Sequence, residues 1–291
     1  MNKGLHFKTI ESQMQYFQAY ENSLQLIEVP FEEKYIQTTF GNSHVICCGD
    51  IKNPPLVLLH AASCGSPIWY PNLPCWSQKY CVYAIDLIGE TSKSILKKKM
   101  KGTKECAQWL DETVRGLGLT KIYLCGLSIG GWNAFNYTSY YPERVLKLVL
   151  LSPVQTFAKM HLSYFLKIMK MGFHPTRENV ENYIGWGSQK EARLPDSIIE
   201  QFTLSVQNMN SNAIFPTWIK KSQFKDIKMP VLLMFGENEF AFSTAQAKKR
   251  ANKYINQLEL EIIKDASHLL SFSKADYVNG RILYFLLSKD M

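Results

Sequence analysis

The sequence predicts an α/β fold, in which helices cover both faces of a mostly parallel central sheet. Short apolar runs bounded by turn residues recur along the chain, and such runs are typical of strands that are buried on both faces. Helical patterns lie between several of these runs, as expected for right-handed strand–helix–strand crossovers. The predicted strands are residues 56–60, 82–86, 122–126, 147–152 and 231–236, and the predicted helices between them are 104–117 and 131–141.

The composition suits a globular protein. Hydrophobic residues make up 46% of the 291 residues and aromatic residues 13%, which is enough for a compact core. The longest apolar stretches are far shorter than the roughly 20 residues of a membrane-spanning helix. The first residues also lack the apolar segment and cleavage site of a secretory signal. We therefore expect a cytoplasmic protein with no membrane partner.

The charge pattern argues against a nucleic-acid partner. The chain has 33 basic and 25 acidic residues, a net charge of +8, but its lysines are scattered. The densest cluster, LKKKMK at 96–101, has no interleaved aromatic residues, whereas nucleic-acid readers combine charge with a recognisable module. Seven cysteines form neither a C-x-x-C pair nor a Cys/His metal spacing. We expect reduced thiols and no bound metal.

A helix and a hairpin open the first predicted part, residues 1–152. Apolar residues at helical spacing predict a helix that ends before Pro30. The run KYIQTTFGNSHVICCG at 34–49 predicts a hairpin that turns at Gly41-Asn42. The apolar residues of the predicted helix include Phe7, Ile10, Met14, Phe17 and Leu24.

A long segment, residues 153–228, separates the last two predicted strands. One crossover needs far fewer residues, and a structureless loop of this length is improbable in a compact domain. Its amphipathic runs, HLSYFLKIMKMG and DSIIEQFTLSVQN, predict an inserted helical lid above the carboxyl ends of the strands. Residues 229–291 then complete the core.

The stretch GLSIG at 126–130 follows a predicted strand and precedes a predicted helix. Ligands of open parallel sheets bind beyond the carboxyl ends of the strands. A serine on such a tight turn has strained backbone angles, and flanking glycines remove the Cβ atoms that would clash. We interpret Ser128 as a nucleophile. The alternative is a tight packing turn with an incidental serine.

A serine nucleophile needs a base, and the base needs a carboxylate that orients it. His268 follows the last apolar run and is expected on the same edge of the sheet as Ser128. Glu237 and Glu239 follow the strand at 231–236, and either could orient the base; we favour Glu239. Asp265 is a competitor that we interpret as a turn residue.

The reaction of such a serine also requires donors for the developing oxyanion. The amide of Ile129, which follows the nucleophile at the start of a helix, is one candidate. Ala62 in the loop LLHAASCGS, after the first buried parallel strand, is the other. We interpret His60 in the same loop as a structural histidine.

Together these segments resemble the α/β-hydrolase fold family, from the hairpin at residue 34 onward, and more narrowly its bacterial cytoplasmic carboxylesterases. LLHAAS is similar to the family's oxyanion loop, AIDLIGETSKS to its D-x-x-G-x-G-x-S loop, and GLSIGG to its nucleophile elbow. GENE falls where the family has G-x-x-D, which places the acid at Glu239. The sequence departs from the family pattern at Ala61 and Glu90, which replace glycines, and in its glutamate acid.

The resemblance implies a serine hydrolase that cleaves carboxylic esters through an acyl-enzyme on Ser128, without a metal or organic cofactor. The expected partner is a small-molecule ester, held by apolar residues that include Trp69, Trp186 and Trp218. One alternative is an amide or carbon–carbon bond hydrolase, like proline iminopeptidases or meta-cleavage-product hydrolases. An iminopeptidase would hold a substrate ammonium with acidic lid residues, for which the candidates are Glu178, Glu181 and Glu191. Another alternative is a ligand sensor with slow turnover.

Overall fold

A computed structural model describes residues 7–188, 193–208, 212 and 214–288. In this part of the chain one sheet has the strand order β1-β2-β4-β3-β6-β7-β8-β9, and β5 pairs with β2. The pairs from β4 to β9 are parallel, whereas β2 pairs antiparallel with β1, β4 and β5. The strands are β1 Phe31–Thr38, β2 Gly41–Cys48, β3 Pro55–Leu59, β4 Cys81–Ile85, β5 Ile95–Leu96, β6 Ile122–Leu127, β7 Val145–Leu151, β8 Val231–Gly236 and β9 Leu258–Ile263.

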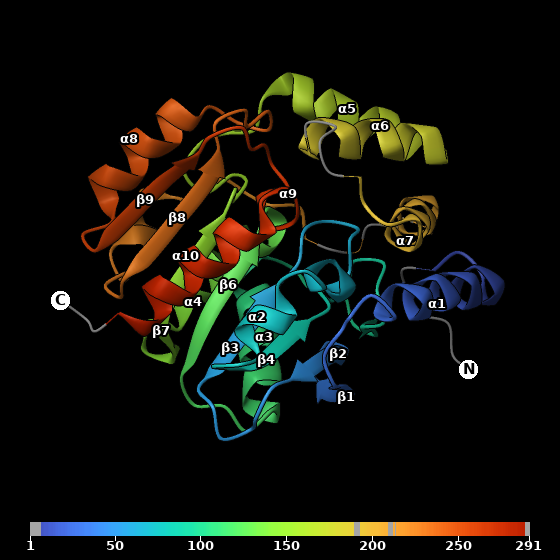
Figure 1. The fold of residues 1–291 in the computed structure, drawn as a ribbon, viewed down its shortest axis with the longest axis horizontal. Helices are drawn as coiled ribbons and strands as arrows, with labels where there is room; N and C mark the ends of the chain where they lie inside the picture. The colour runs from blue at the N-terminus through green and yellow to red at the C-terminus, as the bar shows by residue number, and fades with distance from the viewer. Residues whose placement is uncertain (1–6, 189–192, 209–211, 213, 289–291) are drawn as a thin grey trace.

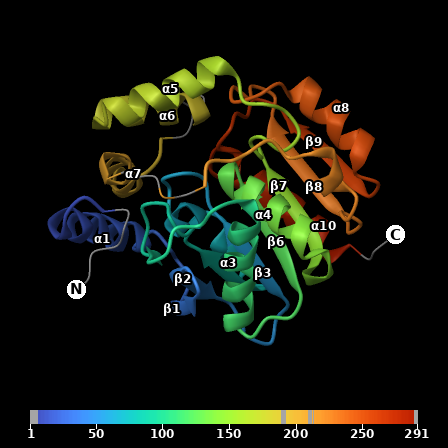
Figure 2. The same cartoon turned by 180° about the vertical axis from the view of Figure 1, so that it is seen from behind.

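Helices cover both faces of the sheet, as the apolar strand pattern predicts. In Figure 1, α10 and α2 lie in front of the sheet, and Figure 2 shows α3 and α4 on the opposite face. The α-helices are α1 Ile10–Leu24, α2 Leu73–Trp76, α3 Thr103–Gly116, α4 Ile129–Tyr140, α5 Leu162–Phe173, α6 Arg177–Ser188, α7 Asp196–Asn208, α8 Thr244–Tyr254, α9 Leu270–Ser273 and α10 Ala275–Leu287, and the short 3₁₀ helices are Ser66–Trp69, Pro142–Arg144 and Lys221–Phe224.

Strand β3 shows why the predicted strands read as continuous apolar runs. Leu56 and Leu58 face one hydrophobic core, and Val57 and Leu59 face the other. Successive side chains of a strand point to opposite faces, so a strand covered on both sides buries every residue. The predicted parallel sheet is confirmed.

The hairpin forms, but the predicted turn is wrong. Thr38 pairs with Gly41, so the chain reverses at Thr39-Phe40, and Asn42 lies inside β2. Phe40 is buried in the core. Gly41 instead allows strand β5 to approach the backbone of β2 closely. Its φ is +146°, and a Cβ atom there would lie 2.0 Å from the carbonyl oxygen of Ile95 in β5. The glycine marks a strand contact and not the turn itself.

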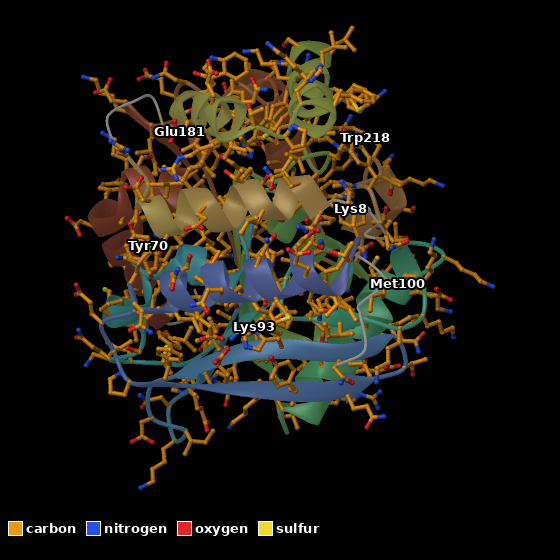
Figure 3. The ribbon with its side chains drawn as sticks, turned by 90° about the vertical axis from the view of Figure 1, so that its right-hand side faces the viewer. Lys8, Tyr70, Lys93, Met100, Glu181 and Trp218 are labelled. Carbon is orange, nitrogen blue, oxygen red and sulfur yellow. The ribbon has the colours of Figure 1, made fainter. Side chains whose placement is uncertain are left out.

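The first helix forms, but part of its predicted apolar face is wrong. The hydroxyl oxygen of Thr9 accepts a hydrogen bond from the amide of Ser12, which caps the helix start. Ile10 and Met14 are exposed, whereas Tyr16 and Tyr20 are fully buried. The buried face is set by packing against α7, which lies directly above α1 in Figure 3.

In the described residues between β7 and β8, the α-helices are α5, α6 and α7, and the short 3₁₀ helix Lys221–Phe224 follows them. The α-helices lie outside the sheet, where Figure 1 shows α5 and α6 side by side above α7. Tyr183 of α6 and Phe202 of α7 pack ring to ring, with centroids 6.0 Å apart. The predicted helical content of residues 153–228 is therefore present in the described part of the segment.

Candidate active site

Ser128 stands between β6 and α4 in a strained conformation. Its φ is +56°, a region that favours glycine. The elbow also packs closely against its neighbours, because a Cβ atom on Gly130 would lie 2.1 Å from the carbonyl oxygen of Leu59 at the end of β3. On Gly126 it would lie 2.3 Å from the carbonyl oxygen of Gly130. The two glycines are therefore required by the turn, and the strain is concentrated on the serine.

His268 reaches Ser128 from the loop after β9. Its Nε2 atom lies 2.8 Å from Oγ of Ser128. Its Nδ1 atom lies 2.9 Å from each carboxylate oxygen of Glu239, which follows β8. The loops after β8 and β9 touch closely: a Cβ atom on Gly236 would lie 2.3 Å from the carbonyl oxygen of Ala266. This contact brings Glu239 and His268 together.

The other acidic residues considered as partners of the histidine, Glu237 and Asp265, do not form a hydrogen bond with its Nδ1 atom. The carboxylate of Glu237 accepts a hydrogen bond from the amide of Asp265, at 3.3 Å. Both residues are exposed on the outer side of the turn. Asp265 itself has a φ of +51° and is a turn residue, as predicted. Of these acidic residues, Glu239 is the one whose carboxylate lies within hydrogen-bond distance of the histidine.

Burial strengthens the electrostatic interaction between His268 and Glu239. The side chains of His268 and Glu239 are 2% and 0% exposed. Burial raises the pKa of the Glu239 carboxyl, but His268 and the amide of Ala241 outweigh it, so that the pKa lies below its usual value. An ionised Glu239 accepts a hydrogen bond from the Nδ1–H group of His268, and in this tautomer Nε2 accepts a hydrogen bond from the Ser128 hydroxyl.

A model of the alpha/beta hydrolase fold family matches residues 54–275. The chain belongs to the α/β-hydrolase family. It is 37% identical to an uncharacterized carboxylesterase of Bacillus subtilis, over 94% of this chain and 92% of that protein. Carboxylesterase YbfK of the same organism is 34% identical over 97% of both chains. The crystal structure of naproxen esterase from Bacillus subtilis superposes with a TM-score of 0.90, at 33% identity over 96% of this chain and 99% of that one.

The loop after β3 of this α/β hydrolase lies beside the elbow, since the carbonyl oxygens of Leu59 and His60 face Gly130. Ala62 is exposed and Ile129 is buried. Their amides as oxyanion donors remain predictions. Nδ1 of His60 lies 2.7 Å from the carbonyl oxygen of Ala61, and its Nε2 accepts a hydrogen bond from the amide of Leu87. Backbone groups thus engage both ring nitrogens, consistent with a structural histidine.

The three tryptophans considered for substrate binding lie in different places. Trp69 is fully buried and packs against Trp76, so its ring belongs to the core and does not form the wall of a cleft. Trp218 stacks on the guanidinium of Arg250 in α8, 3.8 Å from the ring centroid. Trp186 of α6 packs against Phe240, which in turn packs against His268. Trp186 alone of the three is linked by ring contacts to the histidine in the described residues.

Sequence reasoning missed two aromatic side chains that pack against the histidine, Tyr164 and Phe240. The rings of Tyr164 and Phe240 lie 6.0 and 5.6 Å from the ring of His268. Tyr164 of α5 hydrogen-bonds Tyr183 of α6 through their hydroxyls, at 3.0 Å. We call Tyr164, Tyr183, Trp186 and Phe240 the aromatic cover. Phe240 follows Glu239 directly in the sequence, and this adjacency was the one available signal.

A buried ionic network supports the loop after β4. The carboxylate of Asp86 accepts hydrogen bonds from the amides of Ser66 and Lys93 and lies 3.0 Å from Nδ1 of His44. Nε2 of His44 lies 2.7 Å from Glu33, which also pairs with Lys93. Lys93 lies between α1 and the first strands in Figure 3. The network ties the hairpin to both loops near the elbow.

In residues 7–188, 193–208, 212 and 214–288, no group of three or more His, Cys, Asp or Glu side chains is arranged to hold a metal ion. No helix in the same ranges has the length and apolar character needed to cross a membrane.

Proposed function

We propose that this α/β hydrolase cleaves carboxylic esters through an acyl-enzyme on Ser128. The observation that carries the proposal is the hydrogen-bonded series of Ser128, His268 and Glu239. The relatives named above as carboxylesterases support the same reaction class. A serine hydroxyl is a poor nucleophile alone, and a neutral imidazole that can take its proton activates it.

In the proposed reaction, Oγ of Ser128 attacks the ester carbonyl while Nε2 of His268 takes the hydroxyl proton. The amides of Ala62 and Ile129 hold the oxyanion of the tetrahedral intermediate. The intermediate collapses, the carbon–oxygen bond to the alcohol breaks, and His268 gives its proton to the leaving alcohol. Water then loses a proton to His268 and attacks the acyl group, which releases the acid and restores Ser128.

Glu239 has an orienting role in this scheme. Its carboxylate holds the proton on Nδ1 and stabilises the imidazolium that forms in both steps. No step requires a metal ion or an organic cofactor. The glutamate is one methylene longer than the aspartate of the family pattern, and both of its oxygens lie within hydrogen-bond distance of Nδ1.

We further propose that the helices of residues 153–228 act as a lid. Ser128 is 5% exposed, and the aromatic cover lies over His268. A substrate therefore reaches the hydroxyl when the cover moves, with Trp186 at its outer edge 38% exposed. Aromatic walls favour an apolar or aryl group on the ester.

The iminopeptidase alternative finds less support. Glu181 is paired with Arg177 at 2.8 Å, and Glu178 is exposed on α6. Glu191 lies outside the described residues. Neither carboxylate contacts the Ser128–His268–Glu239 series in the described residues.

The proposal is tested by intact-protein mass after incubation with a fluorophosphonate, together with hydrolysis of p-nitrophenyl acetate, butyrate and octanoate. We expect one adduct, lost in Ser128→Ala, and multiple turnover. Ser128→Ala also reports on folding, since its circular dichroism should match the wild type. Absence of an adduct would overturn the mechanism. An adduct with a single turnover would favour the ligand sensor, and an adduct without ester turnover would favour an amide or carbon–carbon bond hydrolase.

A further inference from the structure

Glu90 is an acidic side chain near the proposed site that the mechanism above does not use. It lies in the loop after β4, close to the network around Asp86. Burial raises the pKa of its carboxyl, against the lowering effect of His60 and of the Ser63 amide. Among the described residues, no cationic side chain forms an ion pair with Glu90. Burying a carboxylate costs free energy unless other groups form hydrogen bonds with it.

The carboxylate of Glu90 contacts the proposed oxyanion loop directly. Its Oε2 atom accepts a hydrogen bond from the amide of Ser63, at 3.2 Å. Ser63 follows Ala62, the proposed oxyanion donor, and has a φ of +61°. A non-glycine residue in this left-handed region costs roughly 1 kcal/mol or more, and persists where surrounding contacts hold it. The hydrogen bond from Ser63 to Glu90 is such a contact.

Glu90 also borders the second proposed donor. It lines one small cavity together with Ile129, the first residue of α4, and Asn133, one turn further along the helix. Its neighbour Thr91 donates a hydrogen bond to the carbonyl oxygen of Ser205 in α7, which anchors the loop to the inserted helices. Glu90 therefore lies between the two segments whose amides would bind the oxyanion, on a loop fixed at both sides.

We propose that Glu90 is a positioning residue: by accepting a hydrogen bond from the Ser63 amide it holds Ser63 in its left-handed conformation, and this fixes the adjoining Ala62 so that its own amide points at the oxyanion. This inference rests on the proposed function. Ser63 lies within a turn in which the carbonyl oxygen of Ala61 accepts a hydrogen bond from the amide of Cys64. The role needs a hydrogen-bond acceptor and not a charge, since a negative charge would oppose a nearby oxyanion.

The test compares Glu90→Ala with Glu90→Gln in the full chain, with exposed Glu143→Ala as the matched control. Removing an oxyanion donor outright costs about 10²–10³ in kcat. Loss of its orientation in Glu90→Ala should therefore lower kcat for p-nitrophenyl butyrate by about 10–100-fold, with little change in KM. Glu90→Gln keeps an acceptor oxygen and should stay close to the wild type, as should Glu143→Ala.

Two readouts separate positioning from general loss of structure. A trifluoromethyl ketone forms a tetrahedral oxyanion on the serine, so its affinity should fall in Glu90→Ala in proportion to kcat/KM. Glycine adopts a positive φ without strain, so Ser63→Gly should restore part of kcat in the Glu90→Ala background. Full activity of Glu90→Ala would overturn the inference, as would equal losses in Glu90→Gln and Glu90→Ala or no recovery by Ser63→Gly. Failure of the wild type to turn over esters or to form the adduct would instead contradict the proposed function.

Discussion

The Nε2 atom of His268 lies 2.8 Å from the Oγ atom of Ser128, although 140 residues separate the two along the chain. The contact exists because parallel strands deliver their carboxyl ends to one edge of the sheet. Ser128 follows β6 and His268 follows β9, and β7 and β8 lie between these strands. The chemistry proposed for this pair depends on which ring nitrogen carries the proton, and in the proposed mechanism the hydrogen bond to Glu239 keeps that proton on Nδ1.

Glu239→Gln should lower kcat by about 10³–10⁴ while the protein stays folded. A glutamine can donate to Nδ1 and so favours the wrong tautomer of His268. Steady-state kinetics with p-nitrophenyl butyrate measures the loss, and thermal unfolding checks the fold. Glu237→Gln is the matched control, because Glu237 contacts the Asp265 amide and not the histidine. A larger loss in Glu237→Gln would contradict the assignment of the acid.

Phe240→Ala should open access to Ser128. The Phe240 ring packs against Tyr164, Tyr183, Trp186 and His268. Each such ring contact contributes about 0.5–1.5 kcal/mol, so losing them should favour the open lid. We expect the labelling rate with a bulky fluorophosphonate to rise about 5–10-fold, relative to a small one.

The ratio of the two labelling rates is the decisive quantity for Phe240. A change in the triad itself would alter both probes equally, and an equal change would contradict the access role. Phe272→Ala serves as the control, because Phe272 packs against Tyr70.

Gly130→Ala should cost several kcal/mol or prevent folding. Its Cβ atom would lie 2.1 Å from the carbonyl oxygen of Leu59 and 2.6 Å from that of His60, both backbone atoms that cannot move aside. Gly280→Ala is the matched control, because apart from its chain neighbours and the nearby backbone of α10 no atom lies within 4 Å of its Cβ position. That change should stabilise the protein by about 0.5–1 kcal/mol. Urea unfolding of both variants measures the difference, and equal stabilities would contradict the packing described for the elbow.

Glu33→Gln should destabilise the protein by about 2 kcal/mol near pH 6. The hydrogen bond with His44, followed by that with Lys93, lowers the pKa of Glu33 from 4.5 to about 2. A depressed carboxyl pKa contributes stability above its unfolded value of 4.5, and this contribution is lost as the pH falls toward 2. The difference between variant and wild type should therefore shrink between pH 4.5 and pH 2.

The pKa of His44 is raised by Asp86 and Glu33 against the effect of burial, so its pairing with Glu33 holds at pH 6. Urea unfolding at several pH values measures the effect of Glu33→Gln. Glu32→Gln on the same strand is the control, because its pairing with Lys34 is exposed and should contribute under about 1 kcal/mol. A pH-independent difference for Glu33→Gln would contradict the role of the buried network.

Local sequence patterns were sufficient to predict the parallel sheet and the strand-to-helix turn at Ser128. Both Gly126 and Gly130 sit where a Cβ atom would clash with backbone, and this requirement is visible in the sequence as GLSIG. The hairpin turn and the face of α1 were not predictable in this way. Gly41 is required by the neighbouring β5, and Ile10 is exposed because α7 packs on the other side of α1. Both effects come from partners far away in the chain.

The sequence by itself determined the parallel sheet, the strand-to-helix turn at Ser128 and the set of residues from which a base and an acid could be drawn. These follow from burial periodicity and backbone sterics, which act over a few residues. The sequence favoured Glu239 over Glu237, and the tertiary structure showed that Glu239 contacts His268. Only the tertiary structure decided that Trp69 belongs to the core and that Tyr164 and Phe240 pack against the histidine. Those choices depend on how loops from β8, β9 and the inserted helices converge in space, and residues adjacent in sequence can point to opposite sides of such loops.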